Sequence, residues 1–321
     1  MKASPLKSPA PRHSPRAPLF DVLGLGCVAV DDLLFVKTWP PQDTKTPVKR
    51  RERHCGGLTA TALVTAARLG LRCAYAGVLG EDELSRFVLE ALRREHVHTG
   101  HAAILRGARP VQSAIIVDET AGTRNVFYST EGVIGAGPRH PSEKLIRASR
   151  VLFVDRFGMP GMIRAARVAR AAGIPVVADL ENSDVPRFKE LFRLADHLIV
   201  SREFALRHTR AEHPATAVAR LLSEGRRQVV VVTCGEQGCW FQQNDWRLPS
   251  FHPAFRVAVV DTTGCGDVFH GAYAAGLAAG LPLAERVRLA SAAAALKATR
   301  AGGQAGIPTR RTVEAFLRKH R

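Results

Sequence analysis

The sequence predicts an α/β protein with a mostly parallel central β-sheet and helices on both faces. From Asp21 onward, short runs rich in β-branched residues alternate with amphipathic or alanine-rich segments of helical length. The chain has 321 residues, enough to bury the core of one large α/β domain. It contains no internal repeat and no Pro/Gly-rich linker that would divide the body after residue 17.

Six β-rich runs predict the strands of the parallel sheet, at 22–30, 73–78, 151–154, 175–178, 197–200 and 228–233. Six helices are predicted at 58–69, 83–96, 161–172, 215–224, 266–279 and 283–299.

Two segments break this alternation, 34–53 and 103–128. The second contains VQSAIIVDETAGTRNVFY, which is typical of two strands joined by a glycine turn. We expect both segments to form a small separate sheet. It would act as a lid over the carboxyl ends of the parallel strands, where open α/β sheets bind ligands.

The composition is that of an ordinary soluble globular chain, with 46% hydrophobic and 23% charged residues. No stretch approaches the roughly 18 apolar residues of a membrane span. The formal net charge of +17 would suit nucleic acid, an anionic surface or a phosphorylated ligand. A solvated, arginine-rich surface explains the same charge, and we prefer that interpretation.

The N-terminus and the cysteines indicate where the protein works. Residues 1–17 are rich in Pro, Ser, Lys and Arg and lack the apolar core of a secretory signal, so we expect a disordered basic tail. The six cysteines form no C-x-x-C pair. We therefore expect reduced thiols and a cytoplasmic location.

The segment 259–271, VVDTTGCGDVFHG, carries the strongest chemical signal. A β-rich run ends, a turn with two Thr and two Gly follows, and a helix of small residues begins, so backbone N–H groups converge on a site for phosphate. Asp267 lies in the first helical turn, where it could accept a proton from an attacking hydroxyl. The alternative is that Asp267 only complements the helix dipole and the glycines only serve the turn.

This segment closely resembles the D-T-x-G-A-G-D signature of the PfkB (ribokinase-like) family of carbohydrate kinases, with Cys265 at the usual Ala. Segments 55–61 (CGGLTAT), 233–238 (TCGEQG) and 295–308 (ALKATRAGGQAGIP) resemble other family motifs in the family's order. The resemblance implies a three-layer α/β/α sandwich and phosphoryl transfer from Mg·ATP. It also implies that Asp267 is the catalytic base and that the amides of Gly264, Cys265 and Gly266 form the anion hole.

The resemblance assigns the remaining site residues by motif. Substrate contacts fall on Asp31, Gly57, Thr61, Asp155 and Arg124, the last reaching toward the phosphates. Nucleotide contacts fall on Thr233, Gly235, Gly238 and Gly303. Asp261 with the 295–308 run would hold a monovalent cation, K⁺, and Glu203 would position Mg²⁺ through water. Each assignment has a plainer alternative as a turn, strand-end or helix-cap residue.

Three departures from the family pattern bear on the substrate and the metal. Leu58 and Thr61 stand where ribokinase and ketohexokinase carry sugar-binding Asn. The motif forms look most like the sulfofructose kinase branch, with ketohexokinase more distant, yet the Arg expected to bind a sulfonate is displaced by one residue, to Arg156. The family's N-x-x-E segment is replaced by SREF at 201–204.

We therefore predict an ATP-dependent kinase that phosphorylates a primary hydroxyl of a ketohexose or related keto-sugar. A nucleoside kinase is the nearest alternative. A dinucleotide-dependent oxidoreductase, suggested by Gly24 and Gly26, fails because a strand rather than a helix follows. A nucleic-acid-binding protein would leave the phosphate site unexplained. The lid strands suggest a homodimer, and we expect neither nucleic acid nor membrane as a partner.

Overall fold

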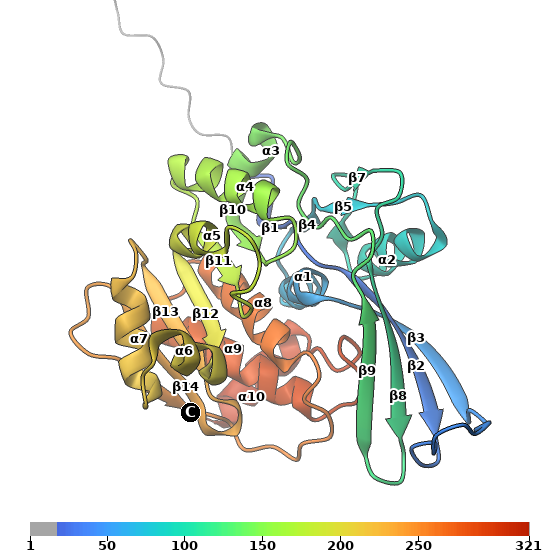
Figure 1. Cartoon of the computed structure of the whole chain (residues 1–321). Coiled ribbons are helices and arrows are strands. Elements are labelled where there is room, and N and C mark those ends of the chain that lie inside the picture. Colours follow the sequence, from blue (N-terminus) through green and yellow to red (C-terminus); the bar gives the residue numbers. More distant parts are fainter. Residues whose placement is uncertain (1–17, 321) are drawn as a thin grey trace, which may run out of the picture.

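The computed structural model describes residues 18–320, in which a large sheet lies between two layers of helices and a smaller sheet projects from its edge (Figure 1). The predicted tail, 1–17, lies outside the described residues. The three-layer α/β/α architecture with a separate small sheet confirms the predicted fold class. Within residues 18–320, no helix combines the length and apolar character needed to cross a bilayer.

The large sheet is parallel except at one edge, where β13–β14 and β14–β15 pair antiparallel. Its nine strands follow the order β15 (Ser250–Pro253), β14 (Gly238–Gln243), β13 (Val229–Thr233), β12 (His197–Ser201), β11 (Val176–Asp179), β10 (Ser149–Val154), β1 (Phe20–Gly24), β4 (Cys73–Tyr75) and β6 (Val97–His98).

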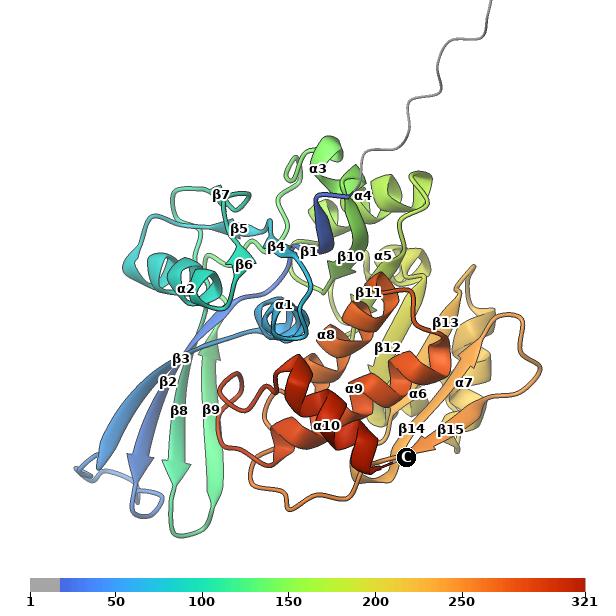
Figure 2. The ribbon, with the colours of Figure 1, turned by 180° about the vertical axis from the view of Figure 1, so that it is seen from behind.

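Each face of this sheet has its own helical layer and its own core cluster. One layer is formed by α1 (Leu58–Arg68), α2 (Glu83–Arg94), α8 (Cys265–Ala278), α9 (Leu283–Ala298) and α10 (Arg310–Lys319), as Figure 2 shows. The other is formed by α3 (Glu143–Arg147), α4 (Met159–Ala171), α5 (Phe188–Leu194), α6 (Arg202–Thr209) and α7 (Pro214–Ser223).

Strand β10 illustrates how the sequence fills both cores. Val151 and Phe153 belong to one cluster, whereas Leu152 and Val154 belong to the other, because successive side chains of a strand point to opposite faces. All four are buried. A strand covered on both faces therefore reads as a continuous apolar run, and each such side chain stabilises the fold by roughly 1.5–3 kcal/mol relative to exposure.

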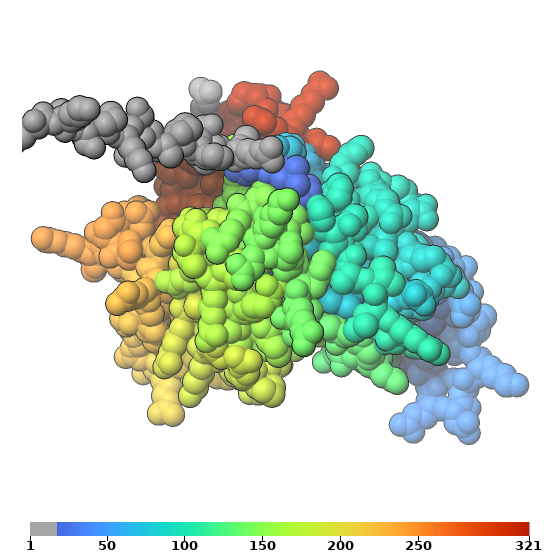
Figure 3. Space-filling view, turned by 90° about the horizontal axis from the view of Figure 1, so that it is seen from above, coloured from blue at the N-terminus to red at the C-terminus, as the bar shows by residue number. Residues whose placement is uncertain are grey.

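The small sheet is the predicted lid, with the order β3 (Arg50–Gly56), β2 (Ala29–Val36), β8 (Val111–Asp118) and β9 (Thr123–Ser129). Only β2 and β8 pair parallel. The sheet extends toward the side to which strand β12 points (Figure 1). From above, the blue part of the chain that includes β3 protrudes beyond the main body (Figure 3).

The prediction of one strand over 22–30 is wrong, because the chain leaves the large sheet after Gly24 and enters the lid at Ala29. Gly26 lies in the turn between β1 and β2. A Cβ atom there would lie 1.9 Å from Oδ2 of Asp155, so only glycine allows this close approach.

The second predicted lid segment, 103–128, also needs correction. Its first residues form β7 (Ala103–Ile104), which pairs with β5 (Val78–Leu79) in a separate two-stranded sheet. The lid portion begins at Val111. Strands of two residues are too short to show a hydrophobic period, so the sequence pattern could not separate β7 from the lid.

Candidate active site

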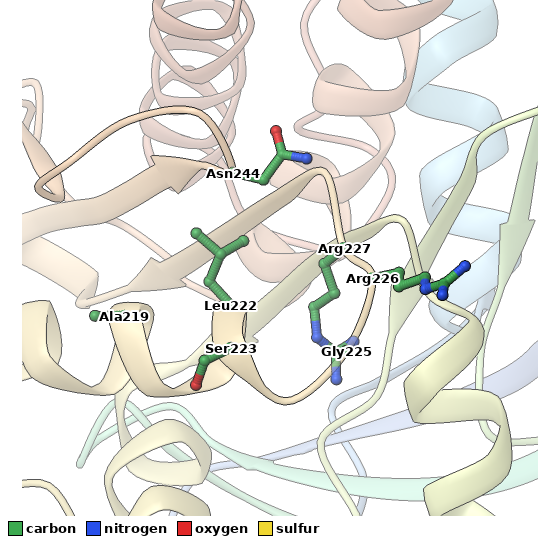
Figure 4. A pocket seen from close by; sticks show the side chains of 7 residues that line it. All are labelled: Ala219, Leu222, Ser223, Gly225, Arg226, Arg227 and Asn244. Atoms are coloured by element: carbon green, nitrogen blue, oxygen red, sulfur yellow. The ribbon is translucent and has the colours of Figure 1, made fainter.

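The predicted site residues gather mainly around the N-terminus of α8, the carboxyl ends of the parallel strands and the lid. A different hollow, of about 430 Å³, lies between the end of α7 and the amino end of β13 (Figure 4). It is lined by Arg226, Arg227 and Asn244, among others, and contains none of the predicted site residues. The predicted site residues lie at the other end of the strands, their carboxyl ends.

Helix α8 begins in a way that leaves backbone donors open. Gly264 caps it with φ +75°, a left-handed conformation that favours glycine. The N–H of Cys265 turns back to the carbonyl of Thr262 at 3.1 Å, so this amide is partly engaged. No group in residues 18–320 accepts from the N–H groups of Gly264, Gly266 or Asp267. A Cβ at Gly266 would meet nothing within 4 Å, so there is room for an anion.

The Asp267 carboxyl lies beside these donors in the first turn of α8. Burial and the negative charge of Asp179 raise the pKa of Asp267 well above its usual value, and Glu181 adds to the effect. A carboxylate with a raised pKa is a stronger proton acceptor than an ordinary one. The arrangement can therefore deprotonate a hydroxyl close to a bound phosphate.

His270 lies one turn further along α8 and is almost completely buried. Its Nδ1 donates to the carbonyl of Gly266 at 2.8 Å, and its Nε2 donates to that of Ile199 at 3.1 Å. Both nitrogens face acceptors, which requires the imidazolium form. Burial would lower the pKa of His270, but the carboxylate of Asp179, 3.7 Å from Nδ1, and these two carbonyls raise it.

The predicted sugar side is formed by β2 and the start of α1. Gly57, the N-cap of α1, has φ +96°, and a Cβ there would lie 2.6 Å from Cα of Val28, so glycine is required. Asp31 on β2 is partly exposed, and burial raises the pKa of its carboxyl. Leu58 and Phe157 pack against a small apolar cluster at the root of the lid. The Asp31 carboxyl and this apolar cluster together can bind a hydroxylated ring.

Two residues predicted to contact substrate are instead buried. Asp155 is 0% exposed and accepts from the N–H of Cys27, the N–H of Phe157 and the hydroxyl of Thr59, at 2.6 to 2.8 Å. Burial raises the pKa of Asp155 to about 6. Thr61 is also buried, and its hydroxyl accepts from Gln304. The structure places both as residues that hold the site together.

The predicted nucleotide residues lie in two turns, one after β13 and one next to the cap of α8. Thr233 ends β13 and pairs in register with Ser201 at the end of β12. Gly235 and Gly238 follow in a tight turn with φ of +57° and +119°. Gly303 lies against the cap of α8, because a Cβ at Gly264 would be 3.3 Å from the Gly303 carbonyl oxygen.

Asp261 is tied to four groups around it. Its Oδ1 accepts from the N–H and hydroxyl of Thr263 and lies 3.3 Å from the Arg124 guanidinium of the lid. Its Oδ2 accepts from the N–H of Gly302 at 2.9 Å, and its backbone oxygen accepts from Nζ of Lys297 at 2.7 Å. Burial would raise the pKa of Asp261, but the bonds from Thr263 and the charge of Lys297 hold it below its usual value.

The structure does not bring Glu203 into this group. Its side chain is 85% exposed and pairs with Arg207 one turn along α6. The carboxylates near Asp267 are instead Asp179 and Glu181, at the end of β11, which the sequence interpretation missed. Their position at the carboxyl end of a parallel strand is the signal that could have found them. Among residues 18–320, no three or more His, Cys, Asp or Glu side chains cluster as a metal site.

Cys265 occupies the usual Ala position at the start of α8. Burial raises the pKa of its thiol above the usual value, although Lys297 opposes the shift. The alternative of an activated thiol at the helix N-terminus is therefore not supported. All six cysteines are free thiols.

Comparison with known proteins agrees with this geometry. A model described as "pfkB family carbohydrate kinase" matches residues 25–310, most of the chain. The chain belongs to this family. It is accordingly a sugar kinase, a phosphotransferase with an alcohol group as acceptor. Under this assignment, the oxidoreductase alternative has no support, since Gly24 and Gly26 lead into the lid.

Individual PfkB relatives resemble the chain at moderate identity. Fructokinase-1 of Oryza sativa subsp. japonica is 27% identical, over 79% of this chain and 85% of the relative. A structure assigned as a ribokinase from Agrobacterium tumefaciens is 29% identical, with a TM-score of 0.87 and coverage of 94% and 98%. Ribokinase of Arabidopsis thaliana, solved with ribose and ATP, is 24% identical, with a TM-score of 0.84 and coverage of 94% and 99%.

Proposed function

We propose that this PfkB kinase transfers the γ-phosphoryl group of Mg·ATP to a primary hydroxyl of a ketohexose or related keto-sugar. One observation carries the chemistry: the Asp267 carboxyl lies beside open backbone N–H groups at the N-terminus of α8. A base and an anion site in contact are what in-line attack of a hydroxyl on a phosphate requires.

Each part of the site then has a role. Asp267 accepts the proton of the attacking hydroxyl, and the N–H groups of Gly264 and Gly266 stabilise the charge that develops on the transferred group. The turn carrying Thr233, Gly235 and Gly238 and the turn around Gly303 enclose the nucleotide. Mg²⁺, bound to the ATP phosphates, would neutralise their charge.

The sugar would lie between Asp31 and the apolar wall at the root of the lid. Asp31 binds hydroxyls as a partly exposed carboxylate, and Gly57 lets the sugar approach the backbone. Asp155 and Thr61 are buried positioning residues that hold the backbone and side chains around this pocket through their hydrogen bonds. Relatives include both ribokinases and a fructokinase, and the keto-sugar proposal therefore rests on the motif forms and on Leu58 replacing an amide donor.

Arg156 gives the proposal a further testable detail. Its guanidinium stacks on the Phe157 ring, 4.7 Å from the centroid. Burial raises the pKa of Asp179 and of Cys27, and the charge of Arg156 opposes this rise at both groups. A cation thus stands near the proposed sugar pocket. For that reason, the sugars tested as substrates should include anionic keto-sugars as well as neutral ones.

The test is ADP release with Mg·ATP over fructose, tagatose, ribose, sulfofructose, 2-keto-3-deoxygluconate and adenosine. For Asp267→Asn we expect kcat to fall by about 10³-fold while ATP affinity stays within about threefold, because the anion site remains. The matched control is Asp245→Asn, an exposed carboxyl of the β14–β15 loop. Near-normal turnover by Asp267→Asn would refute the base, and turnover of adenosine alone would favour a nucleoside kinase.

We also propose a cytoplasmic homodimer in which the lids of two copies meet. The cysteine pattern supports the location. The outer strand of the lid, β9, is exposed along its whole length and carries Val126, Phe127 and Tyr128, exposed by 49%, 55% and 65%. Exposed apolar residues on an edge strand favour pairing with a second copy.

A further inference from the structure

The surroundings of Asp261 do not fit the monovalent cation expected from the family resemblance. A bound K⁺ would need oxygen ligands that no other positive group already occupies. Oδ1 of Asp261 accepts two hydrogen bonds from Thr263 and lies 3.3 Å from the Arg124 guanidinium, and the backbone oxygen accepts from Nζ of Lys297. The Lys297 ammonium stands where a cation would bind these oxygens.

Lys297 is built into this position. Its side chain is 0% exposed, and its Nζ lies 2.7 Å from the Asp261 backbone oxygen and 3.7 Å from Oδ2. It projects from the last turn of α9, where the helix dipole favours a positive charge. A second cation here would meet both this ammonium and the guanidinium of Arg124, which repel it.

The ammonium also connects to the anion site. The N–H groups of Val260 and Asp261 donate to the carbonyl of Ala298, so the segment that leads into the turn before α8 is held at the end of α9. Asp261 in turn binds Gly302, whose neighbour Gly303 lies against the cap of α8. The charge of Lys297 therefore holds Asp261, and through Asp261 the turn at Gly302 and Gly303. This turn contacts the cap of α8, where the N–H groups of Gly264 and Gly266 are open.

We propose that the Lys297 ammonium takes the place of a monovalent cation, so that the kinase binds nucleotide and turns over without K⁺. Lys297 is a positioning residue, since it acts on the anion site through Asp261. The inference rests on the proposed function only for its kinetic readout.

The test compares the wild type with Lys297→Met, which keeps most of the packing without the charge, and Lys297→Ala, which opens space for an ion. Lys144→Met, an exposed lysine of α3, is the matched control. ADP affinity by calorimetry, the thermal midpoint and ADP release are each measured in KCl and in tetramethylammonium chloride at equal ionic strength.

We expect the wild type and Lys144→Met to agree within about twofold between the two salts. Lys297→Met should bind ADP about tenfold more weakly in both, because a hydrogen bond to a charged donor is lost. Lys297→Ala should recover part of this affinity in KCl but not in tetramethylammonium chloride.

The inference would be overturned if K⁺ raised the ADP affinity of the wild type severalfold or raised its thermal midpoint by several degrees. It would also be overturned if Lys297→Met bound ADP as tightly as the wild type. If both Lys297 variants fail to fold, the wild-type comparison decides alone. If no sugar is turned over in either salt while ADP binds equally in both, the proposed substrate fails and the inference stands.

Discussion

At the scale of residues, a buried ion pair lies beneath the proposed base. His270, protonated because both its nitrogens donate to carbonyls, faces Asp179, and Asp267 lies one turn away on α8. Asp179 raises the pKa of Asp267 whereas His270 lowers it, so the balance of the pair tunes the base. A carboxylate in this setting can act as a proton acceptor near neutral pH rather than only as a dipole-complementing residue.

The first prediction concerns the pH dependence of this base. Asp267 must be ionised to accept a proton, and its pKa is raised above 3.8 by burial and by Asp179. Activity should therefore be lost as pH falls through a value above that of an ordinary aspartate, about 4. Asp179→Asn removes a negative charge, so the acid limb of kcat/KM should move to lower pH. The measurement is the pH profile of both proteins with the same substrate.

An acid limb that stays in place in Asp179→Asn would mean that another group sets it. The control is Asp184→Asn, an exposed carboxyl in the β11–α5 loop, which should leave the profile unchanged.

At the scale of elements, the N-terminus of α8 depends on a left-handed cap. Gly264 and Gly280 flank this helix with φ of +75° and +76°. A Cβ at Gly264 would lie 3.3 Å from the Gly303 oxygen, whereas one at Gly280 would meet nothing within 4 Å. The two glycines therefore share the backbone conformation but differ in what surrounds them.

Alanine at each position separates strain from function. Gly264→Ala and Gly280→Ala should both lower the free energy of unfolding by roughly 1 kcal/mol, the cost of a left-handed alanine. Only Gly264→Ala should also weaken ADP binding, by about tenfold, because it displaces the turn at Gly303 and crowds the open N–H groups. Urea unfolding and calorimetry measure the two effects. Equal ADP affinity in both variants would contradict the assigned anion site.

At the scale of the whole molecule, the lid is joined to the body at few points. Its Arg124 pairs with Asp261, an ion pair with one exposed partner that contributes at most about 1 kcal/mol. Its root packs on Leu58 and Phe157. Strand β9 is exposed along its whole length, and we propose that a second copy of the chain covers it.

The last prediction tests that assembly. Phe127→Asp should convert a dimer, of about twice 34.8 kDa, into a monomer, because a charge replaces apolar surface at the centre of β9. Leu248→Asp is the matched control, since Leu248 is 76% exposed away from the lid. Sedimentation equilibrium gives the mass. A wild type that sediments as a monomer would refute the lid dimer.

The sequence by itself determined the α/β class and the separate small sheet, and it singled out the turn before α8 and Asp267 as the candidate anion site and base. These depend on local patterns: a hydrophobic period, a glycine turn that opens a helix, and the order of motifs along the chain. The pattern failed where the chain changes sheets at Gly26, because a run of β-rich residues does not show which sheet each half joins.

Only the tertiary structure decided which polar groups meet. Asp155 bonds the N–H of Cys27 across 128 residues of sequence, and Lys297 bonds Asp261 across 36. Such contacts arise from how the helices and strands pack. They cannot be predicted from the position of an aspartate at a strand end or of a lysine in a helix. The same packing exposes Glu203, brings Asp179 near Asp267, and places the Lys297 ammonium against Asp261, where the family resemblance implied K⁺.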